Sequence, residues 1–461
     1  MDVQLDTVGY SLPYMSIKPN ILLVNPWIHD FAAYDFWAKP LGLLQLAGIL
    51  QRHGMTISYI DCLDRLHPSA SPSDPLARYG RGPYRKTPIT KPPGLEDVDR
   101  TYSRYGIEKE WFGESLKAIG KPDLILVTSL MTYWYPGVQE TIQELKNRFP
   151  NAPVILGGVY ATLCHDHAKQ YSGADRVVSG PGEEGLLDLV QAFTGFKAAS
   201  GFDPENLDSF PYPAFQLQSR LNYVPLMMSR GCPFACAYCA SHFLNPKLMQ
   251  RRPASVVEEI EYWHEKWRVI DFAFYDDALL VNSGKQIIPI LQQIIEKGLN
   301  LRFHTPNALH VREINQEVAV LMFKAGFKTI RLGLETAAFA HRGALDSKVT
   351  ADEFSRAVDH LKAAGFRKEQ VGAYLLWGLP EQAIEEVEES IRIVQNCGIT
   401  PVIAHYTPIP HTDLWPQAVA ASRYDLAADP VFTNNAIMPC QKEPFSWSTI
   451  SRLKKQISGV R

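Results

Sequence analysis

Three cysteines near the middle of the chain form the clearest chemical pattern in the sequence. Cys232, Cys236 and Cys239 follow one another in C-x3-C-x2-C spacing between Pro225 and Ser241, after an apolar run that predicts a strand. Three thiolates on one loop suit a metal ion or an iron–sulfur centre far better than a disulfide. A closed structural metal site uses four protein ligands, so three cysteines leave one metal position open for a small molecule.

This loop resembles the signature of the radical S-adenosylmethionine (SAM) enzymes. Tyr238 stands where that family usually has an aromatic residue before the last cysteine. The resemblance implies that the three cysteines hold a [4Fe–4S] cluster, whose fourth iron is chelated by the amino and carboxyl groups of SAM. The alternative is a zinc knuckle completed by a distant histidine or cysteine, such as His242.

Composition limits the class of protein. A chain of 461 residues is too long for one typical domain, and its 46% hydrophobic and 21% charged residues are ordinary for a globular protein. The net charge of −3 gives no sign of a nucleic-acid-binding face. Met1–Tyr14 shows no secretory pattern, and no apolar run reaches the length of a membrane span.

Cysteine usage favours a reducing compartment. Of the seven cysteines, the four outside the central loop are scattered: Cys62, Cys164, Cys397 and Cys440. They are expected to be free thiols, which fits the cytoplasm. The sequence leaves the oligomeric state open.

The first half of the chain alternates between apolar strands and helices about five times. Strands are expected at 21–27, 56–62, 122–129, 154–158 and 174–179. This alternation predicts an α/β domain with a doubly wound, Rossmann-like parallel sheet. Residues 65–110 interrupt it with clustered Pro, Gly, Arg and Tyr, which is long for a connection between a strand and a helix. We expect an ordered insertion that forms an interface, with disorder as the alternative.

The order of elements in this half resembles the cobalamin-binding domain that precedes many radical SAM enzymes. The matching features are Pro122-Asp123, the segment 156–163 and the segment 173–184. Ligands of such sheets bind at the carboxyl ends of the strands, where glycine lets the backbone approach a ligand closely. The resemblance therefore implies cobalamin contacts at Asn25, Ser129, Leu130, Tyr133, Gly157, Gly158, Tyr160, Gly180 and Glu183.

Two departures from the cobalamin pattern affect the expected site. The D-x-H-x-x-G motif that supplies an axial histidine is absent, because His165, Asp166 and His167 have the wrong order. No histidine is thus expected at the lower face of the corrin. The segment Thr132–Tyr135 is bulky, so its aromatic rings either pack on that face or fill its space. A vestigial domain without cobalamin is the alternative.

The second half predicts a barrel. After a Pro- and aromatic-rich linker, six strand–helix units follow from Val224, which predicts a (β/α)6 partial TIM barrel, the architecture of radical SAM domains. The expected segments are an arm at 1–19, the cobalamin-binding-like domain at 20–197, the linker at 198–220, the barrel at 221–415 and an extension at 416–461 that can cap the barrel.

The family pattern also places candidates for SAM binding at the carboxyl ends of the barrel strands. These are Tyr238, Asp276, Asp277, Arg331, Glu335 and Gly378. Glu335 is expected to accept hydrogen bonds from ribose hydroxyls, and Arg331 to meet the SAM carboxylate. Gly378 belongs to a segment near the adenine.

No catalytic residue can be named from the sequence. Tyr374, His405 and Cys440 are the candidates. His304, His310 and His411 are further polar residues expected near the barrel mouth, but a lone histidine is more often a packing residue.

The resemblance implies reductive cleavage of SAM to a 5′-deoxyadenosyl radical, with electrons from a donor such as flavodoxin or ferredoxin. With cobalamin bound, the expected reaction is methyl transfer to an unactivated carbon of a small molecule or natural-product precursor. One alternative is cyclisation or rearrangement without net methylation, and another is a radical SAM enzyme without cobalamin. An alternative of a different class is a non-catalytic iron–sulfur or zinc protein. The sequence does not identify the substrate.

Overall fold

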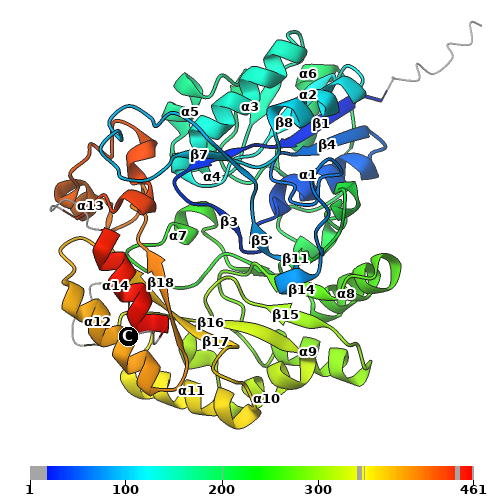
Figure 1. The fold of residues 1–461 in the computed structure, drawn as a ribbon. Helices are drawn as coiled ribbons and strands as arrows, with labels where there is room; N and C mark the ends of the chain where they lie inside the picture. The colour runs from blue at the N-terminus through cyan, green and yellow to red at the C-terminus, as the bar shows by residue number, and fades with distance from the viewer. Residues whose placement is uncertain (1–17, 200, 340–344, 347, 442–446, 459–461) are drawn as a thin grey trace, which may run out of the picture.

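Two parallel sheets organise the chain, one in each half (Figure 1). The computed structural model describes residues 18–199, 201–339, 345–346, 348–441 and 447–458. The N-terminal domain occupies the upper half of the view in Figure 1 and the barrel the lower half. None of the helices in these ranges is long and apolar enough to cross a membrane.

The N-terminal sheet has five parallel strands in the order β10-β9-β8-β1-β4. Its strands are β1 (Asn20–Asn25), β4 (Thr56–Asp61), β8 (Leu124–Val127), β9 (Val154–Leu156) and β10 (Arg176–Val177). Alternate residues of β1 enter two different cores: Leu22 and Val24 pack on one face, and Ile21 and Leu23 on the other. Burial on both faces explains why these strands are continuous apolar runs. The doubly wound fold expected from the sequence is confirmed.

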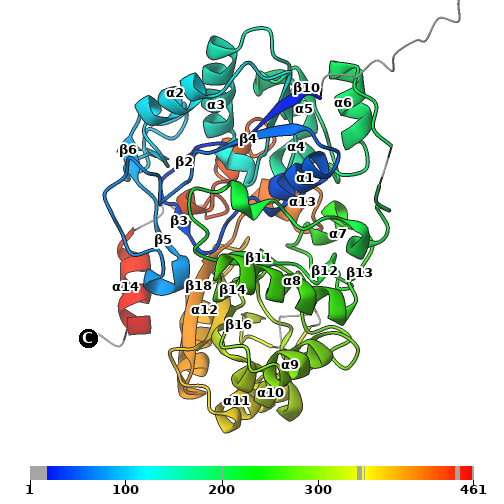
Figure 2. The ribbon, with the colours of Figure 1, turned by 90° about the vertical axis from the view of Figure 1, so that its right-hand side faces the viewer.

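Helices cover both faces of this sheet (Figure 2). They are α1 (Leu41–Arg52), α2 (Lys109–Ala118), α3 (Tyr135–Arg148), α4 (Val159–Leu163), α5 (His165–Tyr171) and α6 (Leu186–Thr194). The linker lies against α1, where the backbone N–H of Ala214 donates to the carbonyl of Leu44 at 2.9 Å. It contains two short helices, η3 (Leu207–Ser209) and η4 (Phe215–Leu217).

The segment between β4 and β8 forms small antiparallel sheets with the chain that follows β1. One sheet joins β2 (Ile28–Asp30), β7 (Ser103–Tyr105) and β6 (Lys86–Pro88), and the other joins β3 (Tyr34–Asp35) and β5 (Gly82–Pro83). The short helix η1 (Ala77–Gly80) precedes β5. Trp37 and Tyr79 from these segments pack in one cluster with Tyr223 and Ala273 of the barrel domain. The insertion therefore contributes to the contact between the two domains.

The second sheet is the expected six-stranded partial barrel, with all strands parallel in the order β11-β14-β15-β16-β17-β18. The strands are β11 (Val224–Leu226), β14 (Asp271–Phe274), β15 (Arg302–His304), β16 (Phe327–Glu335), β17 (Val371–Trp377) and β18 (Thr400–His405). Their helices cover the outer face: α8 (Pro253–Trp267), α9 (Ile287–Glu296), α10 (Gln316–Ala325), α11 (Ala351–Ala364) and α12 (Ile384–Asn396). The short helix η5 (Val311–Glu313) lies between β15 and α10.

Local sequence signals explain where α11 begins and where α10 and α11 end. Thr350 and Glu353 form a capping box at the start of α11. Gly326 and Gly365, with φ of 100° and 108°, end α10 and α11 in the left-handed conformation that glycine tolerates best.

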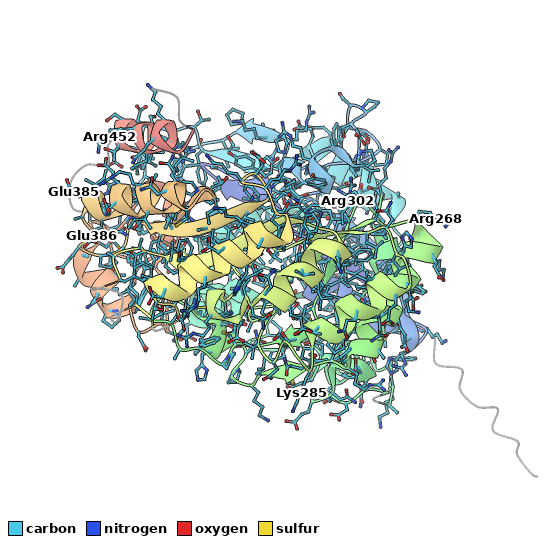
Figure 3. All side chains as sticks on the ribbon, turned by 90° about the horizontal axis from the view of Figure 1, so that it is seen from below. Arg268, Lys285, Arg302, Glu385, Glu386 and Arg452 are labelled. Atoms are coloured by element: carbon cyan, nitrogen blue, oxygen red, sulfur yellow. The ribbon has the colours of Figure 1, made fainter. Side chains whose placement is uncertain are left out.

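The C-terminal extension contacts both domains rather than only capping the barrel. It contains α13 (Trp415–Ala421), η7 (Pro430–Thr433), η8 (Asn435–Ile437) and α14 (Trp447–Ser458). Asn434 donates to buried Asp30 of the N-terminal domain at 2.9 Å. On the barrel side, Arg452 of α14 pairs with Glu388 of α12 at 3.0 Å. Viewed from below, Arg452 and Glu385 lie along the same edge of the molecule (Figure 3).

Candidate functional site

The cysteine loop leaves the barrel through a tight turn. It lies between β12 (Ser229–Arg230) and α7 (Ser241–Leu244), and β12 pairs with β13 (Met249–Gln250). Gly231 has φ of +89°, and a Cβ at this position would lie 2.4 Å from the carbonyl oxygen of Lys247. Only glycine fits this conformation and this approach of two backbones.

Asp276, at the end of β14, holds the chain that enters the loop. Its carboxylate accepts hydrogen bonds from the backbone N–H of Met228 at 3.2 Å, and from the N–H and hydroxyl of Ser229, both at 2.6 Å. Burial raises the pKa of Asp276 to about 7, although these hydrogen bonds oppose the shift. Asp276 was expected to contact SAM, but the hydrogen bonds of its carboxylate go to Met228 and Ser229, at the entry to the loop. The adjacent Asp277 accepts a hydrogen bond from Ser241 at 2.6 Å.

A lysine lies among the cysteines. Lys348 Nζ is 2.9 Å from the hydroxyl of Tyr238, 3.7 Å from Glu335 and within hydrogen-bonding reach of Cys236. Burial acts to lower the pKa of Lys348, but the charges of Glu335 and Cys236 outweigh it and raise the pKa. Sequence reasoning missed this residue because no recognisable motif surrounds it in the sequence.

The cysteine side chains suit a cluster. Burial raises the pKa of Cys236 to about 11, and Lys348 opposes that shift by favouring the thiolate. The charge of Cys239 acts on both Cys232 and Cys236, so the three sulfurs lie in one neighbourhood. Iron–sulfur clusters bind thiolates in surroundings of this kind.

A mononuclear zinc site has less support. In the part of the chain that the structure describes, no three His, Cys, Asp or Glu side chains are arranged to hold one metal ion. His242, the residue considered for a fourth zinc ligand, is exposed on α7. His310 is nearer: its Nε2 lies 4.0 Å from the sulfur of Cys232, and its ring stacks on Phe234 at 4.3 Å between centroids.

A cavity of about 440 Å³ separates the edge of the N-terminal sheet from the cysteine loop. The N-terminal domain lines it with Asn25, Ser129, Leu130 and Gly158, and the barrel domain with Met227, Arg230, Gly231 and Asp277. A second cavity of about 680 Å³ runs along the ends of β8, β9 and β10. The two cavities adjoin, because both are lined by Gly42, Thr128, Gly158, Val159, Arg230 and Asn245.

Two adjacent glycines shape the boundary between these cavities. Gly158 has φ of +96°, and a Cβ there would lie 2.3 Å from the carbonyl oxygen of Ser129. A Cβ on Gly157 would meet no protein atom within 4 Å, and the same is true of Gly180. Gly157 and Gly180 therefore border open space that a flat ligand or its tail can occupy.

The remaining residues expected to bind cobalamin are placed differently. Glu183 lines the larger cavity and pairs with Arg230 at 2.6 Å, which links the two domains. Tyr133 and Tyr160 are buried in packing and line neither cavity. The hydroxyl of Tyr160 lies 2.8 Å from Nδ1 of His167.

The bulky segment Thr132–Tyr135 does not fill the cavity. Tyr135 donates to Asp429 at 2.9 Å, and Thr132 lies 3.0 Å from Thr433, so both turn toward the C-terminal extension. Trp134 lines the 440 Å³ cavity and donates to Asp30 at 2.6 Å.

Comparisons with known proteins identify the two halves of the chain. Residues 226–394 match the radical SAM superfamily, and residues 102–190 match the B12 binding domain. The chain belongs to the radical SAM superfamily and carries a B12-binding domain. The matched part of the B12-binding domain contains β8, β9 and β10, and the fold adds β1 and β4 to the same sheet.

Relatives with curated descriptions include two kinds of enzyme. An uncharacterized methyltransferase of Pyrococcus horikoshii is 27% identical over 340 residues, which cover 67% of this chain and 72% of the relative. The anaerobic magnesium-protoporphyrin IX monomethyl ester cyclase of Cereibacter sphaeroides is 27% identical over 345 residues, which cover 67% of this chain and 55% of that cyclase.

A solved structure supports the fold. The radical SAM methyltransferase TsrM from Kitasatospora setae, with cobalamin and a [4Fe–4S] cluster bound, superposes with a TM-score of 0.64 at 16% identity, covering 88% of this chain and 76% of TsrM.

The radical SAM match implies a [4Fe–4S] cluster and SAM, and the B12-binding match implies cobalamin. The cysteine loop fits the cluster by its donor set, and the two adjoining cavities fit a corrinoid with an extended tail. Glu335 and Tyr238 lie beside the cysteines, where SAM contacts were expected, and Lys348 joins them.

The other candidates have contacts of their own within the barrel domain and the C-terminal extension. Gly378 has φ of +94°, and its N–H donates to Gln382 at 3.0 Å. Cys440 is packed in an apolar cluster, donates to the carbonyl of Ala418 at 3.7 Å, and has its pKa raised to about 12 by burial. Burial lowers the pKa of His405 to about 4. Neither His405 nor Cys440 lines the two cavities.

The remaining histidines expected near the barrel mouth have protein partners. His304 is fully buried and lies 3.0 Å from Asp271, and His411 stacks on Phe243 with 4.2 Å between centroids. Tyr374 donates to the carbonyl of Pro306 at 2.9 Å, inside the barrel.

Proposed function

We propose that this enzyme transfers a methyl group from SAM to an unactivated carbon of a small molecule, with cobalamin as the second cofactor. The observation that carries the proposal is the 440 Å³ cavity. Its walls come from the edge of the B12-binding sheet on one side, and from Arg230, Gly231 and Asp277 on the other. A corrinoid in this cavity would thus adjoin the chain segment that leads into Cys232.

When bound, the cluster, SAM and cobalamin supply a 5′-deoxyadenosyl radical and a transferable methyl group, with electrons from a protein such as flavodoxin or ferredoxin. The chain positions and shields them. Asp276 fixes the entry to the cysteine loop through three hydrogen bonds. The Glu183–Arg230 ion pair links the start of that loop to the B12-binding domain.

Lys348 and Glu335 are placed to orient SAM. A carboxylate and an ammonium group beside the cysteines match the hydroxyl groups and the carboxylate of this ligand. We assign the SAM carboxylate to Lys348, because Lys348 contacts Cys236 and Tyr238 whereas Arg331 bonds only within the barrel interior among the described residues.

Cyclisation without net methylation is a second candidate. It is favoured by the similarity to the anaerobic cyclase, which extends over as many residues as the similarity to the methyltransferase of P. horikoshii. Both reactions begin with reductive cleavage of SAM, so cleavage alone does not distinguish them.

The products of SAM distinguish the two candidates. The full-length protein is reconstituted without oxygen, reduced, and mixed with SAM and a small-molecule extract of cells that carry its gene. Methyl transfer predicts both 5′-deoxyadenosine and S-adenosylhomocysteine, formed repeatedly, together with a product that carries the labelled methyl group of SAM. Repeated formation of 5′-deoxyadenosine without S-adenosylhomocysteine would support cyclisation. The Cys232→Ala variant controls for cleavage that does not depend on the cluster.

A further inference from the structure

Several side chains on the inner face of β16, β17 and β18 are only partly buried. Positions that face the helices, such as Ile330, Ala373 and Leu375, are fully buried. Positions of the opposite parity remain partly exposed: Arg331, Tyr374, Leu376, Val402 and Ala404. Because alternate residues of a strand face opposite sides of the sheet, these side chains face the interior of the partial barrel.

The N-terminal domain inserts aromatic groups into this interior. Trp37 stacks on His304 of β15 with 4.4 Å between ring centroids, and Tyr79 lies 5.0 Å from the same ring. The indole N–H of Trp37 donates to the carbonyl of Tyr79 at 2.8 Å. The guanidinium of Arg81 lies over Trp37, 4.9 Å from its centroid. The insertion thereby brings a cation to the barrel strands.

A second guanidinium, that of Arg331 on β16, is close to the first. Its Nη1 donates to the carbonyl of Ile330 at 2.8 Å and lies 3.3 Å from the position of a Cβ on Gly372. Burial lowers the pKa of Arg331, and the charge of Arg81 lowers it further. The same charge of Arg81 also acts on Tyr374.

Neither of these two cations has a carboxylate partner among the described residues. The Nε of Arg81 is buried without a hydrogen-bond partner, and the hydrogen bonds of Arg331 go to a carbonyl and to Tyr374. Other partly buried arginines of this protein are neutralised, as Arg302 is by Asp271 and Arg230 is by Glu183. Two neighbouring cations with little water are unfavourable unless an anion accompanies them.

We propose that Arg81 and Arg331 bind an oxyanion of the substrate, a carboxylate or a phosphate, within the barrel. Guanidinium groups match both anions with paired hydrogen bonds. The inference rests on the proposed function, since it takes the barrel interior to be the place where the radical meets its substrate.

The position of Arg331 argues against the role expected from the sequence. The amino and carboxyl groups of SAM must stay at the cluster, where Glu335 lies. Arg331 is four residues earlier on the same strand, about 13 Å away along it at about 3.3 Å per residue. An arginine there is better placed for a substrate deep in the barrel than for the SAM carboxylate.

The first test measures anion binding by thermal unfolding of the full-length protein, reconstituted without oxygen, at constant ionic strength. Inorganic phosphate and succinate are the two probes. We expect at least one of them to raise the melting temperature of the wild type, and the stronger probe indicates which oxyanion the site prefers. Arg331→Gln and Arg81→Gln should each abolish the shift, whereas Arg331→Lys should retain part of it.

Arg78→Gln is the matched control, because Arg78 is an exposed arginine of the same insertion whose one hydrogen bond among the described residues goes to the hydroxyl of Tyr34. It should keep the shift of the wild type. Equal shifts in the wild type, Arg331→Gln and Arg81→Gln, or no shift in the wild type, would overturn the inference.

The second test measures SAM affinity by equilibrium dialysis. It should be the same in Arg331→Gln as in the wild type. A loss of SAM affinity in Arg331→Gln would indicate that Arg331 binds the SAM carboxylate, and would overturn the proposed site. Failure of the wild type to cleave SAM would contradict the proposed function, while the anion shift would still report on the arginine pair.

Discussion

Substitution of the adjacent glycines Gly157 and Gly158 by alanine should separate ligand binding from folding. At Gly158 the added Cβ would lie 2.3 Å from the carbonyl oxygen and 2.7 Å from the nitrogen of Ser129, and both atoms are backbone. The left-handed φ of +96° adds roughly 1–2 kcal/mol for a residue with a side chain. Moving the backbone adds roughly 1–3 kcal/mol, the usual range for overpacking.

These contributions give a destabilisation of about 3 kcal/mol for Gly158→Ala. For a domain of this size, that corresponds to a fall in melting temperature of roughly 6–12 °C. At Gly157 the outcome should be the opposite. A Cβ there meets no protein atom within 4 Å, so alanine should leave the apo protein as stable as the wild type, or about 0.4–1 kcal/mol more stable.

Gly157→Ala, which should not destabilise the apo protein, should instead weaken the binding of cobalamin. In Gly157→Ala the new methyl group enters the space assigned to the corrinoid, so the affinity for hydroxocobalamin should fall about tenfold, equivalent to about 1.4 kcal/mol. Apo melting curves and spectroscopic titration with hydroxocobalamin measure the two effects on the same samples. Gly113→Ala, on α2, is the control, because Gly113 also has open space around it but lines neither cavity. The same corrinoid affinity in Gly157→Ala and Gly113→Ala would refute the placement of cobalamin.

Other predictions test the cluster, SAM and the anchor of the loop. Cys232→Ala should lose the iron–sulfur absorbance and SAM cleavage, whereas Cys440→Ala should keep both; an intact cluster spectrum in Cys232→Ala would contradict the assignment. Lys348→Met should weaken SAM binding about tenfold, because a charge-assisted hydrogen bond contributes roughly 1.5–3 kcal/mol, and unchanged affinity in dialysis would exclude this role. The pKa of Asp276 is raised from 3.8 to about 7, so between these pH values the folded protein binds a proton that the unfolded chain does not. The stabilisation from this proton is fully present below about pH 4 and is lost as the pH rises through 7. In the wild type, the free energy of unfolding measured by denaturant titration should change by on the order of 4 kcal/mol between pH 4 and 8 because of this group, and Asp276→Asn should remove that change. Parallel pH profiles for the variant and the wild type would contradict this prediction.

The sequence by itself determined the fold class and the candidate cluster ligands, because both follow from local patterns. Continuous apolar strands alternating with helices specify parallel sheets, and the spacing of Cys232, Cys236 and Cys239 places three thiols on one loop wherever that loop lies. The glycines at the ends of strands were also detectable locally, since Gly157, Gly158 and Gly180 border the cavities that the structure contains.

Only the tertiary structure decided which side chains face the cavities and the cysteine loop. Asp276 and Asp277 are adjacent in the sequence, yet one turns inward to bind the backbone at Ser229 and the other lines the cavity. Lys348 and Arg81 carried no motif, and each reaches its site through segments distant in the sequence. Whether a cation has a carboxylate partner depends on which charges folding brings near it. Those neighbours are set by long-range packing, which no local sequence pattern specifies.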